Sequence, residues 1–194
     1  MSLPATRVSK NGTSESTRGQ GRVYVALGSN AAFTDDNKYR LEGAGLFQSV
    51  LHALQRAGIV TLQKSSLWLS PAWPDPTLGD FYNAVVELAL SDNNAQALML
   101  HLLALEDEFG RKRSVKNASR TLDLDLIDYR QIICNARYDG DLILPHPRLH
   151  ERSFVLSPLL EIAPNWYHPV LKCSGAALEK NAQNEWPATK IGSF

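Results

Sequence analysis

Two carboxylates one residue apart, closely preceded by an arginine, are the side chains of this sequence best placed to do chemistry. Residues 120–125 read RTLDLD. If they form a strand, Asp123 and Asp125 share one face, and the alternating leucines anchor the other. Neighbouring carboxylates repel unless a cation lies between them, and oxygen ligands suit Mg²⁺, above all when phosphates complete its coordination. The pattern indicates a magnesium and phosphate site beside Arg120, although taken alone it is more typical of an edge strand whose polar face lies in water.

A run of cationic side chains leads into the acid pair. Five of them lie within ten residues: Arg111, Lys112, Arg113, Lys116 and Arg120. Such a run is usually a solvated segment, but its place directly before two acids favours a clamp for a polyphosphate. Arginine suits this role because its planar fork matches phosphate oxygens and keeps its charge. We expect loop 110–119 to be mobile without ligand and to close when phosphates recruit its arginines.

The elements that must position these side chains follow from hydrophobic spacing and from turn residues. We expect strands over 22–27, 59–69, 81–90 and 121–129, and helices over 41–57 and 94–109. The order β-α-β-β-α-β predicts an α+β, ferredoxin-like core, in which two helices cover one face of a four-stranded antiparallel sheet. Ligands would then occupy the loops and the other face. Residues 130–194 predict an irregular C-terminal extension with a short helix near 154–162.

Length and composition limit the class of protein. A chain of 194 residues with 44% hydrophobic content can build one buried domain, which we place at 22–194, after a disordered tail at 1–21 rich in Ser, Thr, Gly and Asn. Lys plus Arg and Asp plus Glu number 20 each, so no net field favours nucleic acid or an anionic membrane. No apolar run reaches the roughly 18 residues of a membrane helix, and the tail lacks the apolar stretch of a secretory signal. Cys134 and Cys173 are too few for a disulfide framework or a zinc site, which fits a reducing cytoplasm.

The segment RTLDLD resembles the signature of the 6-hydroxymethyl-7,8-dihydropterin pyrophosphokinase family, enzymes of the folate pathway. Other segments resemble the family in the same order: VYVALGSN at 23–30, FYNAV at 81–85, and LPH at 144–146 with RSFVLSPL at 152–159. The resemblance covers about residues 22 to 164. It implies that ATP gives its terminal pyrophosphoryl group to the hydroxymethyl oxygen of the reduced pterin and leaves as AMP.

The same resemblance implies a role for individual residues. Asp123 and Asp125 would hold two Mg²⁺ ions roughly 3.5 to 4 Å apart, with Arg111, Arg113 and Arg120 as the catalytic arginines. Contacts with the ATP co-substrate would come from Glu106, Arg111, Arg113, Arg120, Leu126, His146 and Arg152. Contacts with the pterin would come from Ser70, Ala72, Trp73, Phe81, Asn83 and Phe154. The partners implied are these small molecules alone, and we expect a monomer.

Three positions depart from some members of the family. Loop 110–119 has no tryptophan, Phe81 stands where some relatives have tyrosine, and Pro147 takes the place of a tyrosine after the histidine. Stacking on a pterin survives the change at Phe81, but a hydroxyl contact does not.

Each assignment also has a plain structural alternative. Phe81 and Phe154 fit a hydrophobic core, Glu106 fits the solvated end of a helix, and the Gly-Ser-Asn turn at 28–30 fits architecture better than a phosphate cradle. A non-catalytic ferredoxin-like module that binds a nucleotide or an amino acid is the rival function, because this fold hosts many activities. Such a module has no need for two acids and four arginines, and the retained Asp pair, Arg120 and His146 argue against a decayed paralogue.

Overall fold

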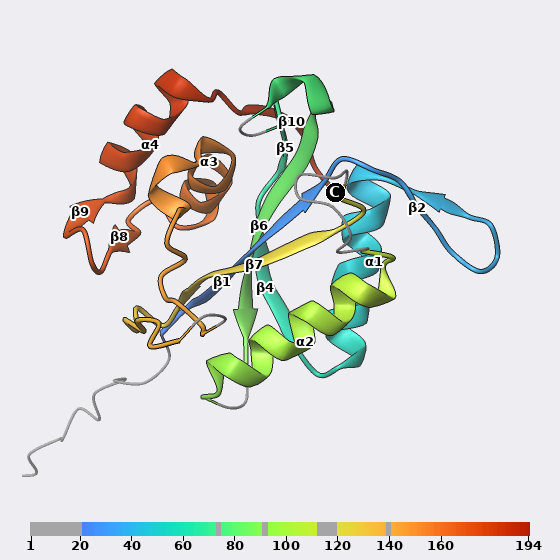
Figure 1. The fold of residues 1–194 in the computed structure, drawn as a ribbon, viewed down its shortest axis with the longest axis horizontal. Coiled ribbons are helices and arrows are strands. Elements are labelled where there is room, and N and C mark those ends of the chain that lie inside the picture. The colour runs from blue at the N-terminus through green and yellow to red at the C-terminus, as the bar shows by residue number, and fades with distance from the viewer. Residues whose placement is uncertain (1–20, 73–74, 91–92, 112–119, 139–140) are drawn as a thin grey trace, which may run out of the picture.

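The computed structural model describes residues 21–72, 75–90, 93–111, 120–138 and 141–194 (Figure 1). The tail expected at 1–21 therefore lies outside the described residues, apart from Gly21. Within the described part, no helix is long and apolar enough to cross a membrane.

One antiparallel sheet forms the centre of the molecule. Its strands run in the order β10 (Thr189–Gly192), β5 (Leu67–Ser70), β6 (Phe81–Ala89), β1 (Val23–Ser29) and β7 (Asp123–Tyr129). β4 (Val60–Lys64) also pairs with β6, so β4 and β5 together occupy the place of the single strand expected over 59–69. At the break between them, Ser65 binds both backbone groups of Val85: its amide donates to the carbonyl at 2.9 Å, and its hydroxyl accepts from the amide at 3.0 Å.

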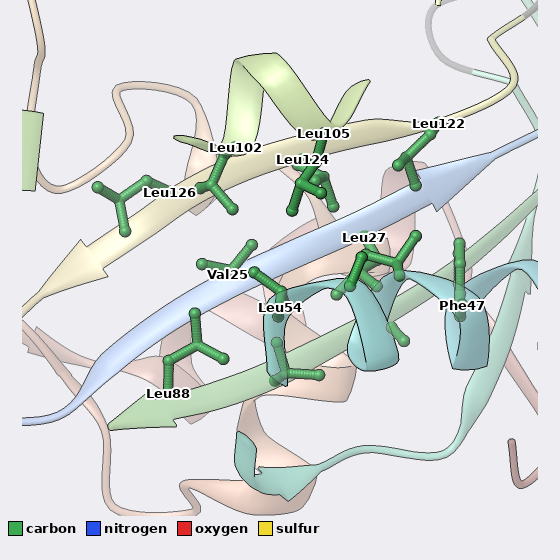
Figure 2. Packing of buried hydrophobic residues seen from close by; sticks show 14 of the residues in the cluster. Val25, Leu27, Phe47, Leu54, Leu88, Leu102, Leu105, Leu122, Leu124 and Leu126 are labelled. Carbon is green, nitrogen blue, oxygen red and sulfur yellow. The ribbon is translucent and has the colours of Figure 1, made fainter. Parts of the chain in front are cut away.

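Helices α1 (Gly43–Arg56) and α2 (Ala95–Glu108) cover one face of the sheet, as the hydrophobic spacing predicts. Alternate residues of the strands point toward them, among them Val25 and Leu27 of β1. Figure 2 shows these side chains packed against Phe47 and Leu54 of α1 and Leu102 of α2. Leu122, Leu124 and Leu126 belong to the same cluster, which confirms that the leucines around the acid pair anchor it to the core.

The second face of the sheet is covered too, by the C-terminal segment that the sequence predicted as an irregular extension. There α3 (Ser153–Ile162) and α4 (Gly175–Glu185) form a second layer, on the left in Figure 1. Tyr24, Ala26 and Val85 of the sheet pack against this layer. The α+β class and the antiparallel sheet are confirmed, while the ferredoxin-like order applies to residues 23–129 and is extended by the segment that follows.

The C-terminal segment is more regular than expected. The helix predicted near 154–162 is confirmed as α3, but α4 and the edge strand β10 were missed. Only Gly175 and Ala182 of α4 are buried, so this helix carries no apolar stripe that its sequence could reveal. Short elements complete the fold: β2 (Phe33–Thr34), β3 (Arg40–Leu41), β8 (Tyr167–His168), β9 (Cys173–Ser174), and the 3-10 turns η1 (Pro76–Leu78) and η2 (Leu149–Glu151).

A carboxylate near the end of α3 ties this second layer to the sheet. Glu161 accepts hydrogen bonds from the Ser66 hydroxyl at 2.7 Å, the Trp68 indole at 3.0 Å and the Lys190 ammonium at 2.9 Å. Burial alone would raise the pKa of Glu161, but these donors outweigh it and lower the pKa from 4.5 to about 2. A lowered pKa means that the ionised form stabilises the folded state.

We expect Glu161→Gln to lower the free energy of unfolding near neutral pH by on the order of 1 kcal/mol, a modest loss because the site faces solvent. The contribution of Glu161 is complete above its ordinary pKa of 4.5 and fades as the pH falls toward about 2. Urea unfolding measured across this window should therefore show a shallower pH dependence in the variant. An identical dependence in both proteins would contradict the role of Glu161.

Candidate active site

The site begins as a row of residues across three neighbouring strands. Gly28 of β1 lies opposite Asn83 of β6 on one side and Asp123 of β7 on the other. A Cβ atom at Gly28 would lie 3.6 Å from Cβ of Asp123 and 3.9 Å from the Asn83 side-chain oxygen. In the next row Ala26 lies opposite Asp125. Gly28 and Ala26, two small residues of β1, thus form the floor between an amide and two acids.

Both acids face this floor, on the face opposite the leucine cluster. The side chain of Asp123 is 16% exposed and that of Asp125 is 30% exposed. Asp123 forms two ion pairs: Nη1 of Arg111 lies 2.6 Å from Oδ1, and Nη1 of Arg120 lies 2.5 Å from Oδ2. Asp125 forms an ion pair with Arg152, whose Nη1 lies 3.2 Å from Oδ2. The carboxylates are accessible, and the partners named here are all cations, as expected for a centre that attracts positive charge.

The turn after β1 fixes the backbone of Arg120. The Asn30 side-chain oxygen accepts from the Arg120 amide at 2.7 Å. In return, the Arg120 carbonyl accepts from the amides of Asn30 at 3.0 Å and Ala31 at 3.2 Å. The Gly-Ser-Asn turn is therefore architectural, as its sequence indicated, and its purpose is to hold the entrance to β7.

His146 lies beside the acid pair and accepts a hydrogen bond through one ring nitrogen. Its amide donates to the Ile127 carbonyl at 2.9 Å, and its Nδ1 accepts from the Arg148 amide at 3.2 Å. Burial lowers the pKa of His146, although the negative charge of Asp125 opposes this. A neutral imidazole whose Nδ1 accepts carries its proton on Nε2, which lies 3.9 Å from Asp125 Oδ2. The ring thus offers an N–H donor on the side of the acids.

Polar and aromatic groups flank the floor on the β6 side. Asn83 donates to the Ser70 hydroxyl at 3.0 Å and to the Phe81 carbonyl at 2.9 Å, which orients its side-chain oxygen toward Gly28. The Phe81 ring borders the same floor, since its Cδ1 lies 4.0 Å from where a Cβ of Gly28 would stand. Phe81 and Phe154 are half-buried, so neither ring is fully enclosed by the core.

Phe154 is linked to the acids through Arg152. The Arg152 guanidinium lies 5.7 Å from the centre of the Phe154 ring and reaches Asp125 at 3.2 Å. Both residues stand at the beginning of α3, which places the second helical layer at the edge of the site.

Several residues that were expected to contact the ligands have buried side chains. The side chains of Glu106 and Leu126 are buried, at 1% and 3% exposure, and their contacts with the nucleotide stay predictions. Ser70, Ala72 and Asn83, which were expected to contact the pterin, are buried as well. Arg113 and Trp73, with most of loop 110–119, lie outside the described residues. Gly28 and Asn30 were not expected as site residues, although the small residues at 26 and 28 share the face of the acids.

The acid pair is a two-carboxylate centre. Among the described residues, no three His, Cys, Asp or Glu side chains gather as ligands of one metal ion. Two carboxylates suit Mg²⁺ when phosphates and water supply the remaining oxygens, whereas a structural zinc site needs more protein ligands.

Comparison with known proteins identifies a family that spans the region of this site. The family model of 7,8-dihydro-6-hydroxymethylpterin-pyrophosphokinase (HPPK) matches residues 24–164. A Synechocystis protein named 2-amino-4-hydroxy-6-hydroxymethyldihydropteridine pyrophosphokinase is 40% identical over 149 residues, which cover 76% of this chain and 69% of that protein. The folic acid synthesis protein fol1 of Pneumocystis carinii is 35% identical over 84% of this chain.

Some relatives are much longer than this chain. The match spans 20% of the Pneumocystis protein and 26% of the folic acid synthesis protein FOL1 of Dictyostelium discoideum. A crystal structure of Plasmodium falciparum HPPK-DHPS resembles this fold with a TM-score of 0.58 at 12% identity, over 86% of this chain and 46% of that one. The structural likeness concerns the fold alone. The family model, in contrast, matches residues 24–164, which include the acids and arginines of the site. Because this match covers most of the sequence, the chain belongs to the 7,8-dihydro-6-hydroxymethylpterin-pyrophosphokinase family.

Proposed function

We propose that this chain transfers the terminal pyrophosphoryl group of ATP to the hydroxymethyl group of 6-hydroxymethyl-7,8-dihydropterin in folate synthesis. The hydroxymethyl oxygen attacks the β-phosphorus, the bond from that phosphorus to the α–β bridging oxygen breaks, and AMP leaves. The hydroxyl proton passes to solvent. The observation that carries the proposal is the pair Asp123 and Asp125, surrounded by Arg111, Arg120 and Arg152, inside the region that the family model matches.

The donor set at the acid pair fits Mg²⁺. Two accessible carboxylates on one strand face suit a hard cation that keeps phosphate and water ligands. We propose that Asp123 and Asp125 hold two such ions, which would supply positive charge at the phosphates of ATP.

The protein itself contributes charge and position. In pyrophosphoryl transfer, catalysis comes mainly from alignment of the attacking and leaving oxygens and from cations that stabilise the spread negative charge. Arg111, Arg120 and Arg152 supply fixed positive charges around the acids, and the Nε2 proton of His146 supplies a neutral donor. Arg113 would join them from loop 110–119.

The pterin would lie over Gly28, because Ala26 is buried beneath the second helical layer. Asn83 offers an in-plane acceptor there, and Phe81 and Phe154 offer faces for stacking.

The free thiols of Cys134 and Cys173 support a reducing compartment such as the cytoplasm.

The direct test is incubation with ATP, Mg²⁺ and the reduced pterin alcohol, followed by separation of the nucleotide products. We expect AMP in amounts equal to the pterin diphosphate, and no AMP when the pterin is left out. Formation of ADP, or binding of ATP without turnover, would contradict the proposal and favour a different kinase or a non-catalytic nucleotide-binding module.

Pterin binding should depend on the aromatic ring near the start of α3. We expect Phe154→Ala to weaken pterin binding by on the order of 1 to 3 kcal/mol and to leave the affinity for a non-hydrolysable ATP analogue nearly unchanged. Calorimetric titration with each ligand measures both effects, and Phe154→Tyr, which keeps the ring, serves as the control. If Phe154→Ala lowers the melting temperature but leaves the pterin affinity per folded molecule unchanged, Phe154 is a core residue only.

A further inference from the structure

Glu106 is a buried carboxylate at the end of α2 that lies behind the site. It is 1% exposed, while Asp107 and Glu108 beside it face solvent. Its Oε1 accepts a hydrogen bond from the Leu124 amide at 2.7 Å and forms an ion pair with Arg111. Leu124 is the residue between Asp123 and Asp125, so one acid contacts both the strand of the acids and one of the arginines.

The contact with Leu124 completes the edge of the sheet. Among the described strands, β7 pairs with β1 alone, so the backbone groups on its other side need partners from elsewhere. Glu106 accepts from the Leu124 amide there, and the His146 amide donates to the Ile127 carbonyl. Glu106 therefore takes the place of a neighbouring strand at the residue that separates the two acids.

The contact with Arg111 is reinforced by the way α2 ends. Gly110 has φ +77°, its amide donates to the Asp107 carbonyl at 3.0 Å, and the Arg111 amide donates to the Glu106 carbonyl at 2.9 Å. This is the hydrogen-bond pattern of a Schellman motif, which fixes the direction in which the chain leaves the helix. Phe33 covers the motif, since a Cβ at Gly110 would approach its ring within 3.2 Å.

The guanidinium of Arg111 then returns to the carboxylate of Glu106 and reaches Asp123 Oδ1 at 2.6 Å. A buried carboxylate is costly unless it is paired and hydrogen-bonded, and Glu106 meets both conditions through Arg111 and Leu124. Its charge is thus committed to the protein rather than to a ligand.

We propose that Glu106 is a positioning residue. It holds Arg111 and the segment from Asp123 to Asp125 in one arrangement, and it acts on phosphates only through them. The identity of the phosphate ligand rests on the proposed function, whereas the positioning role rests on the contacts of Glu106.

The test compares Glu106→Gln with Glu108→Gln, the same chemical change at an exposed acid two residues away. The glutamine at 106 can still accept from the Leu124 amide, but it loses the charge that holds Arg111. We expect turnover and affinity for a non-hydrolysable ATP analogue with Mg²⁺ to fall by on the order of tenfold or more, with the KM for pterin unchanged. Glu108→Gln should match the wild type in all three quantities.

A double-mutant cycle with Arg111→Ala shows whether Glu106 acts through the arginine. In the Arg111→Ala background, Glu106→Gln should cause little further loss of ATP-analogue affinity. If the losses of ATP-analogue affinity from the two substitutions add in full, or if Glu106→Gln alone keeps the wild-type affinity, Glu106 does not position Arg111.

Hydrogen exchange at the Leu124 amide tests the other contact without need of turnover. We expect this edge-strand amide to be protected in the wild type and in Glu106→Gln, and to exchange faster in Glu106→Ala. Rapid exchange of the Leu124 amide in the wild type would show that Glu106 does not hold β7. This measurement does not depend on whether a variant folds. If the wild type produces no AMP, the proposed function fails, but the exchange and ATP-analogue measurements still decide the role of Glu106.

Discussion

Asp123→Asn should lower turnover by several orders of magnitude in saturating Mg²⁺ while the protein still folds, and Asp125→Asn should do the same. Each substitution keeps the shape of the side chain but removes the charge that a divalent ion needs at this centre. Both side chains lie on the face opposite the leucine cluster, so packing is left intact. Steady-state formation of AMP measures the loss, and circular dichroism checks the fold.

The control for this prediction is Asp107→Asn, an exposed acid on α2 that should leave turnover unchanged. Near-wild-type turnover for Asp123→Asn would remove the metal role from the pair. The sequence alone predicts that the two acids repel one another and that the loss of one raises the melting temperature. In the structure both acids are paired with arginines, and we therefore expect no gain in melting temperature from either substitution.

The core strands and the first two helices could be predicted from residue spacing alone. Val23, Val25 and Leu27 alternate with Tyr24 and Ala26 because β1 is buried on both faces, and an apolar run of this kind that ends at a glycine is typical of a central strand. The leucines around the acid pair are read in the same way. Such local patterns fix which face a side chain occupies, and this is why the orientation of Asp123 and Asp125 was predictable.

The second helical layer could not be predicted in this way. α4 buries little more than Gly175 and Ala182, and its attachment depends on contacts far apart in the sequence, such as the hydrogen bond from Gln183 to the Ser157 hydroxyl at 2.9 Å. A periodic pattern reports burial along one element, whereas these contacts depend on the tertiary arrangement. The residues that attach α4 to the rest of the fold therefore follow no local pattern in the sequence.

The roles of Glu106 and Gly28 show the same limit within the site. Three acids at the end of a helix look alike in sequence, and only the packing of α2 on β7 separates the buried Glu106 from its exposed neighbours. Gly28 stands before a turn signal, which explains its presence locally. Its function as the floor between Asn83 and Asp123 depends on the register of three strands.

The arginines of the site occupy the oxygens that a metal ion would need, and this predicts an exchange of partners on ligand binding. Arg111 and Arg120 take the two oxygens of Asp123. A divalent ion alone would have to displace a guanidinium from Asp123. Arg111 would keep its ion pair with Glu106, whereas Arg120 would leave the carboxylate with which it pairs in the described part of the chain. When a polyphosphate arrives with the ion, the guanidinium can move from the carboxylate to the phosphate. We therefore expect metal and nucleotide to bind with strong positive coupling.

Arg120→Ala should reveal this exchange through two effects of opposite sign. The affinity for Mn²⁺ alone, used as a probe for Mg²⁺ in calorimetric titration, should rise because one oxygen of Asp123 is freed. The affinity for the ATP analogue with metal should fall by on the order of ten- to a hundredfold, since a charged hydrogen bond to phosphate is lost, and turnover should fall further. Arg56→Ala, an exposed arginine paired with Glu108, should change neither affinity. If the affinity for Mn²⁺ alone stays constant or falls together with that for the nucleotide, Arg120 does not compete with the metal, and the coupling between metal and phosphate must arise elsewhere in the site.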